Sequence, residues 1–204
     1  MFHSDFEEEL PYQLLTVLIL VCFYGIYFGK MLIQRRRGIR TNQIGRRKEK
    51  GLHTVETLMK TATYAIVPVQ LLSAAFGWSY LTANARFTGF LIGVLGDGVF
   101  LSAVVCMKDS WRAGIPEKDK TSIVTGGIYA YSRNPAFLGF DLMYFGIMLM
   151  FFNVLTVLFT AFAVVMLHLQ ILQEEKYMTA AFGKSYVDYK KRVFRYLGRK
   201  MQRK

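Results

Sequence analysis

Two short polar segments flank an apolar block of this chain, and their residue types could bind a charged small molecule. The first, Arg133-Asn134-Pro135, stands directly before an apolar run, and the second, Glu174-Glu175, follows the next one. Proline is favoured in the first turn of a helix, where free backbone N–H groups and the helix dipole attract anions. Two adjacent carboxylates at a helix end suit a cationic group instead.

Each segment also has an ordinary interpretation. Arg133 could be one more basic residue at a membrane surface, with Pro135 a simple helix start, and the two glutamates could be a solvated pair that balances Lys176. If the apolar block between the segments crosses a bilayer twice, however, both segments meet on the same side. An anion site beside a cation site suits S-adenosylmethionine, which carries an α-carboxylate, an α-ammonium and a sulfonium.

Long apolar runs dominate the 204 residues, of which 53% are hydrophobic. A helix needs about 20 apolar residues to cross a bilayer. We therefore predict an all-α polytopic membrane protein with five transmembrane helices, the last two of which form a hairpin. The predicted spans are residues 12–33, 61–81, 87–107, 135–152 and 154–172. No linker is long enough to separate two domains, so residues 1–204 are expected to form a single membrane domain.

The positions of the charged residues predict an orientation. Residues 1–11 contain four acids and no Lys or Arg, whereas residues 35–50 contain eight basic residues, 108–134 five, and the tail from 174 ten. By the positive-inside rule the N-terminus lies outside and the C-terminus in the cytoplasm. The net charge of +12 then indicates membrane lipid headgroups as counter-charges rather than nucleic acid. No feature indicates an obligate protein partner.

The other candidate residues indicate packing rather than chemistry. Cys22 and Cys106 lie inside predicted spans and are expected to be buried, and the three histidines are scattered, so no metal site is expected. Gly89 and Gly93 form a G-x-x-x-G, which favours close helix packing in the third predicted span.

The C-terminal region is expected to contain a further amphipathic helix. The fifth helix should continue to about Phe182 and break at Gly183, and a new helix should cover 185–197. Its aromatic face could rest on the bilayer interface. The residues of that face are Tyr186, Tyr189, Val193 and Tyr196.

The two polar segments and their hairpin resemble the C-terminal core of the integral-membrane isoprenylcysteine carboxyl methyltransferases and the related phospholipid methyltransferases. The family pattern is roughly G-x-Y-x-x-x-R-H-P-x-x-x-G, a helical hairpin, and E-E-x-x-L-x-x-x-F-G-x-x-Y-x-x-Y-x-x-x-V. Residues in register with it are Gly127, Tyr129, Arg133, Pro135, Gly139, Glu174, Glu175, Phe182, Gly183, Tyr186, Tyr189 and Val193. The resemblance covers about 70 of the 204 residues.

The resemblance implies an S-adenosylmethionine-dependent methyltransferase with a cytoplasmic cofactor-binding core at 124–197 and a lipophilic acceptor that enters from the bilayer. The family histidine is replaced by Asn134, which can donate and accept hydrogen bonds but cannot titrate near neutral pH. The expected cofactor-binding residues are Val124, Gly127, Tyr129, Arg133, Asn134, Pro135, Gly139, Glu174, Glu175 and Tyr186.

His168 and Asp141 are the candidate catalytic residues. His168 lies two helical turns before Glu175, so both should share a face, and it could act as a base toward an amine or only hydrogen-bond another helix. Asp141 could contact an acceptor amine or pair with His168. The prenylcysteine enzymes have an arginine near this place, whereas this chain has His168 and Gln170. We therefore favour a phospholipid-like amine or small lipid over an isoprenylcysteine-type carboxylate.

Two functions of other classes stay open at this point. Some sterol reductases resemble the same C-terminal core and bind a nicotinamide cofactor there, although they are usually much longer. A non-catalytic lipid-binding or transport protein is the other alternative, but the inverted repeats typical of transporters are not visible. Binding of S-adenosylhomocysteine or of a nicotinamide dinucleotide would separate these functions.

Overall fold

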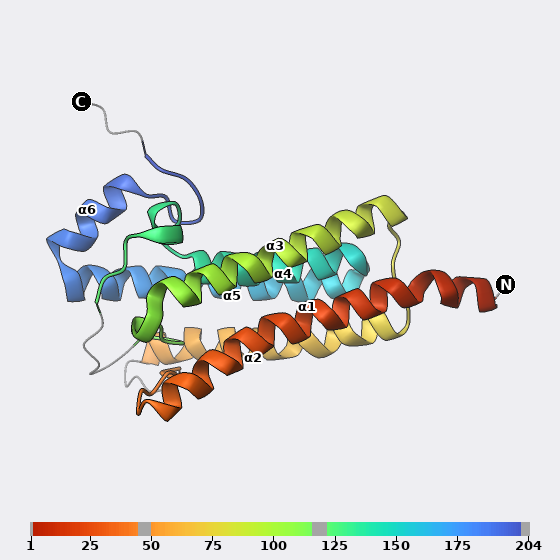
Figure 1. Cartoon of the computed structure of the whole chain (residues 1–204), viewed down its shortest axis with the longest axis horizontal. Coiled ribbons are helices and arrows are strands. Elements are labelled where there is room, and N and C mark those ends of the chain that lie inside the picture. The colour runs from red at the N-terminus through yellow and green to blue at the C-terminus, as the bar shows by residue number, and fades with distance from the viewer. Residues whose placement is uncertain (1, 45–49, 116–121, 201–204) are drawn as a thin grey trace.

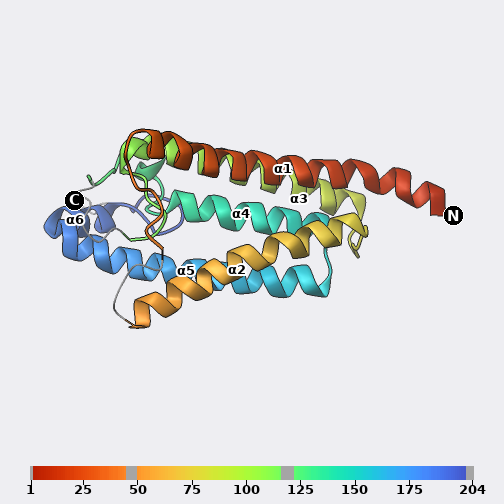
Figure 2. The same ribbon diagram turned by 90° about the horizontal axis from the view of Figure 1, so that it is seen from below.

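The computed structural model describes residues 2–44, 50–115 and 122–200, and within them the chain is helical, as predicted. Five helices run side by side along one axis, and a short sixth lies across one end (Figures 1 and 2). The helices are α1 (Phe2–Arg36), α2 (Lys50–Ala75), α3 (Ala83–Met107), α4 (Pro135–Met150), α5 (Val154–Phe182) and α6 (Lys184–Arg192). Two 3-10 turns, η1 (Lys108–Ser110) and η2 (Gly127–Ala130), follow α3 and precede α4.

Three of the described helices are long and apolar enough to cross a membrane: Leu10–Arg36 of α1, Ala83–Ser110 with α3, and Val154–Phe182 of α5. They contain three of the five predicted spans. The fourth predicted span corresponds to α4, which is apolar but has only 16 residues. The remaining one lies largely in α2, which ends at Ala75 rather than at 81. The fold is thus that of a polytopic all-α membrane protein.

The closest helix contact joins α3 to α4 through glycines. A Cβ atom on Gly146 would lie 2.6 Å from the carbonyl oxygen of Gly89, and one on Gly96 would lie 2.8 Å from the carbonyl oxygen of Gly139. Only residues without a side chain allow the two backbones to approach this closely. The structure confirms the predicted close packing of the third span and identifies α4 as its partner.

The connection from α4 to α5 is a tight turn centred on Asn153, as predicted. Its Oδ1 accepts from the backbone N–H of Thr156 at 3.1 Å, and the Thr156 Oγ1 accepts from the Asn153 N–H at 3.1 Å. This reciprocal capping box starts α5. The Asn153 Nδ2 also donates to the Trp78 carbonyl oxygen at 3.1 Å, which ties the turn to the α2–α3 connection.

At the opposite end of the bundle, the α1–α2 connection pairs with the segment after α3. The Gln43 N–H donates to the Ala113 carbonyl oxygen at 2.8 Å, and the Ala113 N–H donates to the Thr41 carbonyl oxygen at 3.1 Å. The Gln34 side chain binds both of these loop segments, because its Nε2 donates to the Trp111 carbonyl oxygen and its Oε1 accepts from the Thr41 hydroxyl. Residues 45–49 and 116–121 of the two basic segments lie outside the described residues.

The C-terminal region differs from the prediction. The expected break at Gly183 is present, but α6 ends at Arg192, and Val193 forms an antiparallel bridge with Arg199 instead of continuing the helix to 197. Gly198 makes this turn possible with a φ of +115°.

The expected bilayer contact of the α6 aromatic face is also wrong. Tyr186, Tyr189 and Val193 are buried, because α5 extends beyond the predicted span and offers them an apolar surface. Their partly buried neighbours are Ile123, Met178 and Phe182. A further correction concerns Cys22, which is exposed on α1 rather than buried; Cys106 is half-buried.

The α3–α4 contact generates a prediction with two matched glycine variants. Gly146→Ala should destabilise the protein by about 1–3 kcal/mol, since the new methyl group collides with the backbone of α3. Gly98→Ala meets no atom within 4 Å, so it should stabilise α3 by about 0.5–1 kcal/mol. Thermal unfolding in detergent measures both changes. Equal effects of the two variants would contradict the proposed role of the contact.

Candidate functional site

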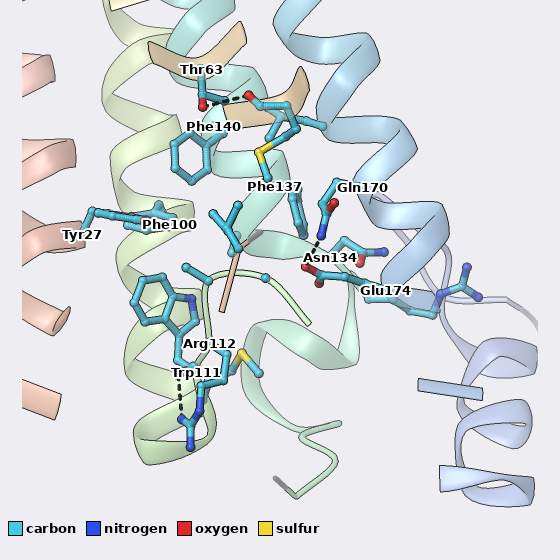
Figure 3. Close-up of a pocket in the computed structure, with 18 of the residues that line it drawn as sticks. Tyr27, Thr63, Phe100, Trp111, Arg112, Asn134, Phe137, Phe140, Gln170 and Glu174 are labelled. Atoms are coloured by element: carbon cyan, nitrogen blue, oxygen red, sulfur yellow. Dashed lines mark hydrogen bonds between the residues drawn. The ribbon is translucent and has the colours of Figure 1, made fainter. Parts of the chain in front are cut away.

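A cavity opens at the end of the bundle where α6 lies, between the ends of α1, α3 and α5 and the beginnings of α2 and α4 (Figures 1 and 3). One part of its lining is polar and comes from the two segments singled out in the sequence. Its residues include Arg133, Asn134, Gln170, Glu174 and Glu175. The other part is aromatic and includes Tyr24, Tyr27, Phe28, Tyr64, Phe100, Phe137 and Phe140.

The Glu175 carboxylate is the centre of a buried ion-pair network. Its Oε1 lies 2.7 Å from an Arg133 terminal nitrogen, and its Oε2 lies 3.0 Å from an Arg195 terminal nitrogen. The Arg133 and Glu175 side chains are 6% and 5% exposed. Charge-assisted hydrogen bonds from two guanidinium groups compensate the burial of this carboxylate. The hydrogen bond to Glu175 also raises the pKa of Arg195.

Asn134, in the place of the family histidine, takes part in the same network. It is the residue before α4, but its side chain does not cap the helix. Instead, Nδ2 donates to the Glu175 Oε1 at 3.3 Å and to the Arg195 carbonyl oxygen at 3.2 Å. An amide donates both bonds without titrating, so in this structure Asn134 joins the α4 start to α5 and to the C-terminal segment.

α6 is held against the same site by its tyrosines. The Tyr189 hydroxyl donates to the Tyr129 carbonyl oxygen at 2.6 Å, and burial raises the pKa of Tyr189, so that the hydroxyl stays protonated. Burial likewise raises the pKa of Tyr186, whose ring lines the cavity. The buried tyrosines of α6 therefore pack against the 127–133 segment and hold it in place instead of contacting lipid.

Glu174 lies between the polar and the aromatic part of the lining. The Gln170 Nε2 donates to its Oε1 at 3.3 Å, and Figure 3 shows both side chains beside Asn134 and Phe137. Of the two adjacent carboxylates, Glu175 lies between two arginines, and Glu174 accepts a hydrogen bond from Gln170.

The expected cofactor-binding residues divide into two groups. Val124, Tyr129, Arg133, Asn134, Glu174, Glu175 and Tyr186 line the cavity. Gly127, Pro135 and Gly139 shape the backbone around it: Gly127 has a φ of +57° against Cys106, Pro135 opens α4, and Gly139 packs on Phe100. Whether any of these residues binds a cofactor remains a prediction.

The two candidate catalytic residues lie elsewhere. Neither His168 nor Asp141 is among the cavity-lining residues, although Glu175 on the same helix as His168 is. The His168 Nδ1 is 2.7 Å from the Tyr196 hydroxyl, and the two rings stack. The Asp141 Oδ1 is buried and has no hydrogen-bond partner among the described residues. The structure does not bring these two side chains to the polar part of the cavity, and their catalytic role stays a prediction.

Sequence reasoning missed two contributions to the site. Arg195 lies beyond the last position of the family pattern, and one more arginine in a basic tail carries no recognisable signal. The connection segments that include Asn42, Ile44, Trp111 and Arg112 also line the cavity. They reach it only because the loop pairing described above joins them, which no local pattern indicates.

The comparison with protein families agrees with this geometry. The model of the phospholipid methyltransferase family matches residues 84–185, which is half of the chain. The chain therefore belongs to the phospholipid methyltransferase family, as its resemblance indicated. The match includes the segment before α4 and the glutamate pair on α5. No curated protein matches the chain significantly. Family membership and the long apolar helices make the chain an integral membrane protein of a methyltransferase family whose reactions involve lipids.

The ion-pair network leads to a stability prediction. Glu175→Gln should destabilise the protein by about 3–5 kcal/mol, because it leaves the buried Arg133 guanidinium without its counter-charge. Glu174→Gln should cost far less, since Gln170 can still donate to the amide oxygen. Thermal unfolding and limited proteolysis of the segment after Gly183 measure the difference. A Glu175→Gln protein as stable as Glu174→Gln would contradict a structural role for the network.

Proposed function

We propose that the protein is an S-adenosylmethionine-dependent methyltransferase that methylates a lipophilic acceptor, with a phospholipid-like amine or small lipid favoured and an isoprenylcysteine-type carboxylate as the alternative. The observation that carries this proposal is the composition of one cavity. Its polar part comes from the two family segments, and its aromatic part extends between α1 and α2. A charged cofactor and an apolar acceptor thus have adjoining places.

The polar part fits the charge pattern of the cofactor. We assign the α-ammonium to the Glu174 carboxylate, because it lines the cavity between its polar and aromatic parts. Arg133 and Arg195 share the single charge of Glu175, so this network has one positive charge in excess, which suits the α-carboxylate. Asn134, Tyr129 and Tyr186 are suited to polar or stacking contacts with the nucleoside. When bound, the cofactor supplies a methyl group on a positively charged sulfur.

The aromatic part offers an acceptor route from the bilayer. α1 packs mainly on α3, and α2 mainly on α5, so that few contacts close the seam between α1 and α2 (Figure 2). Two cavity-lining residues at this seam, Phe28 and Tyr64, are 58% and 65% exposed. Lys60 lies over the Tyr64 ring and could meet the phosphate of a lipid that enters with its acyl chains still in the bilayer.

The contribution of the protein to catalysis would be chiefly positional. Fixing the acceptor in line with the transferred methyl group replaces an encounter in solution by a prearranged one. The Glu175 network and α6 keep the polar part of the site in place, while Phe137 and Phe140 belong to the aromatic part that adjoins it. A participation of His168 would require the release of its hydrogen bond to Tyr196, and Asp141 would have to turn toward the cavity.

We also propose that α1 to α5, including the short α4, span the membrane as one domain, with the cofactor-binding core at 124–197. Successive helices run in opposite directions, so the described residues near the N-terminus and those of α6 lie at opposite ends of the bundle (Figure 1). The basic connections are those at the cavity end, so the positive-inside rule supports a cytoplasmic site and an N-terminus outside.

Loss of the Glu174 charge should weaken cofactor binding. A charge-assisted hydrogen bond is worth about 1.5–3 kcal/mol, so Glu174→Gln should raise the Kd for S-adenosylhomocysteine by roughly ten- to a hundredfold. Asp188→Asn is the matched control, because Asp188 is an exposed carboxylate on α6 that pairs with Lys191 outside the cavity. Calorimetry on purified protein gives both values. Equal affinities in the two variants, or tighter binding of a nicotinamide dinucleotide, would refute the cofactor assignment.

The proposed orientation can be tested by labelling single cysteines in a variant without Cys22 and Cys106. Tyr80→Cys, in the α2–α3 connection, should react with an impermeant reagent added outside intact cells. Ser185→Cys, at the start of α6, should react only after the cells are opened. Labelling of both positions from the same side would exclude the five-span topology.

A further inference from the structure

Gln170 occupies an unusual position in the cavity lining. Its side chain is fully buried on α5, one helical turn before Glu174. It nevertheless lines the cavity, close to Phe137, at the boundary between the polar and the aromatic part (Figure 3). A buried polar residue at the boundary between two ligand-binding regions is well placed to contact both ligands.

The hydrogen bond to Glu174 fixes which way the Gln170 amide points. A carboxylate oxygen can only accept, so the amide group that lies 3.3 Å from the Glu174 Oε1 must be the Nε2 donor. The carbonyl oxygen Oε1 therefore points away from Glu174. It is buried and has no hydrogen-bond partner among the described residues. An acceptor without a partner is costly to bury, and this cost is removed when a ligand donates to it.

We infer that the Gln170 Oε1 accepts a hydrogen bond from the amino group of a lipid acceptor and so selects an amine for methylation. This inference rests on the proposed function and adds which atom of the protein recognises the amino group of the acceptor. The nearby seam between α1 and α2 provides for the apolar part of the same molecule, and the Glu174 carboxylate favours positive charge close to the amine.

The chemistry of amine methylation strengthens this contact as the reaction proceeds. The acceptor ammonium first loses one proton to water. The neutral amine nitrogen then forms a bond to the methyl carbon while the carbon–sulfur bond breaks and its electron pair stays on sulfur. The positive charge moves from sulfur to nitrogen, so the product is a methylammonium and no proton has to leave during the step. The N–H bonds become more acidic as this charge develops, and their hydrogen bond to Oε1 becomes charge-assisted.

The same arrangement disfavours a carboxylate acceptor. The Oε1 atom has no hydrogen to donate, and the Gln170 Nε2 is already directed to Glu174. A carboxylate at this place would face a carbonyl oxygen on one side and the Glu174 charge on the other. Gln170 thus determines the acceptor specificity, and a substitution at this position can reverse the preference for an amine over a carboxylate.

The test uses Gln170→Met, which keeps the length of the side chain but removes the acceptor Oε1 together with the Nε2 donor to Glu174. The matched control is Gln70→Met on α2, because Gln70 is also fully buried with an unpartnered Oε1 but does not line the cavity. Three quantities are measured on full-length protein: the Kd for S-adenosylhomocysteine, the Kd for a short-chain phosphatidylethanolamine without cofactor, and kcat/KM for labelled methyl transfer to that lipid and to a prenylcysteine analogue.

We expect Gln170→Met to lower kcat/KM for the aminolipid about ten- to a hundredfold and to weaken aminolipid binding. The Kd for S-adenosylhomocysteine should rise by at most about tenfold, and by less than the aminolipid Kd, because Glu174 keeps its charge and loses only one hydrogen bond from a neutral amide. Gln70→Met should alter none of these ratios. Gln170→Arg should in addition favour the prenylcysteine analogue, since it supplies a cation for the carboxylate.

Four results would overturn the inference: an unchanged aminolipid kcat/KM in Gln170→Met, an equal loss in Gln70→Met, a parallel loss of cofactor affinity, or a wild-type protein that methylates only the prenylcysteine analogue. In all four, wild-type cofactor binding leaves the proposed methyltransferase function standing. A wild-type protein that does not bind S-adenosylhomocysteine would remove the proposed function itself, and the inference about Gln170 with it.

Discussion

One buried carboxylate holds the functional end of this protein together. Glu175 joins three segments that are far apart in the sequence: the entry to α4 through Arg133 and Asn134, α5 itself, and the C-terminal turn through Arg195. A buried ion is tolerated only where opposite charges and donors surround it, so the three segments must dock together. The wall of the polar part of the cavity forms as a result of this docking.

The sequence predicted the elements whose signals are local. Apolar length located the helices, the Asn153 turn located the hairpin, and the hairpin in turn brought Arg133 and Glu175 to the same end. The prediction of what surrounds α6 was wrong. The spacing of Tyr186, Tyr189 and Val193 shows that they share a surface but does not show what covers it, and the extension of α5 provides a protein surface instead of lipid. Arg195 had no pattern at all, because its importance depends entirely on the turn that follows α6.

The two parts of the cavity have different origins along the chain. The polar part is built by segments within residues 84–185, the range that matches the family. Much of the aromatic part comes from α1 and α2, which lie outside that range. In terms of the proposed function, the family match covers the proposed cofactor site and leaves out much of the proposed acceptor site. This division explains why family membership identifies the reaction more readily than the lipid.

The length of α4 has a consequence for the setting of the reaction. Its 16 residues extend about 24 Å, whereas the 29 residues of α5 extend about 44 Å. α4 ends and α5 begins at the Asn153 turn. Because α5 is longer, its far end extends several helical turns beyond the start of α4 (Figure 2). In the proposed arrangement the reacting groups sit at the depth of the lipid headgroups instead of above them. Bilayer thickness then affects the access of water to the site. A thicker membrane covers the start of α4 with lipid, and a thinner one exposes it to water.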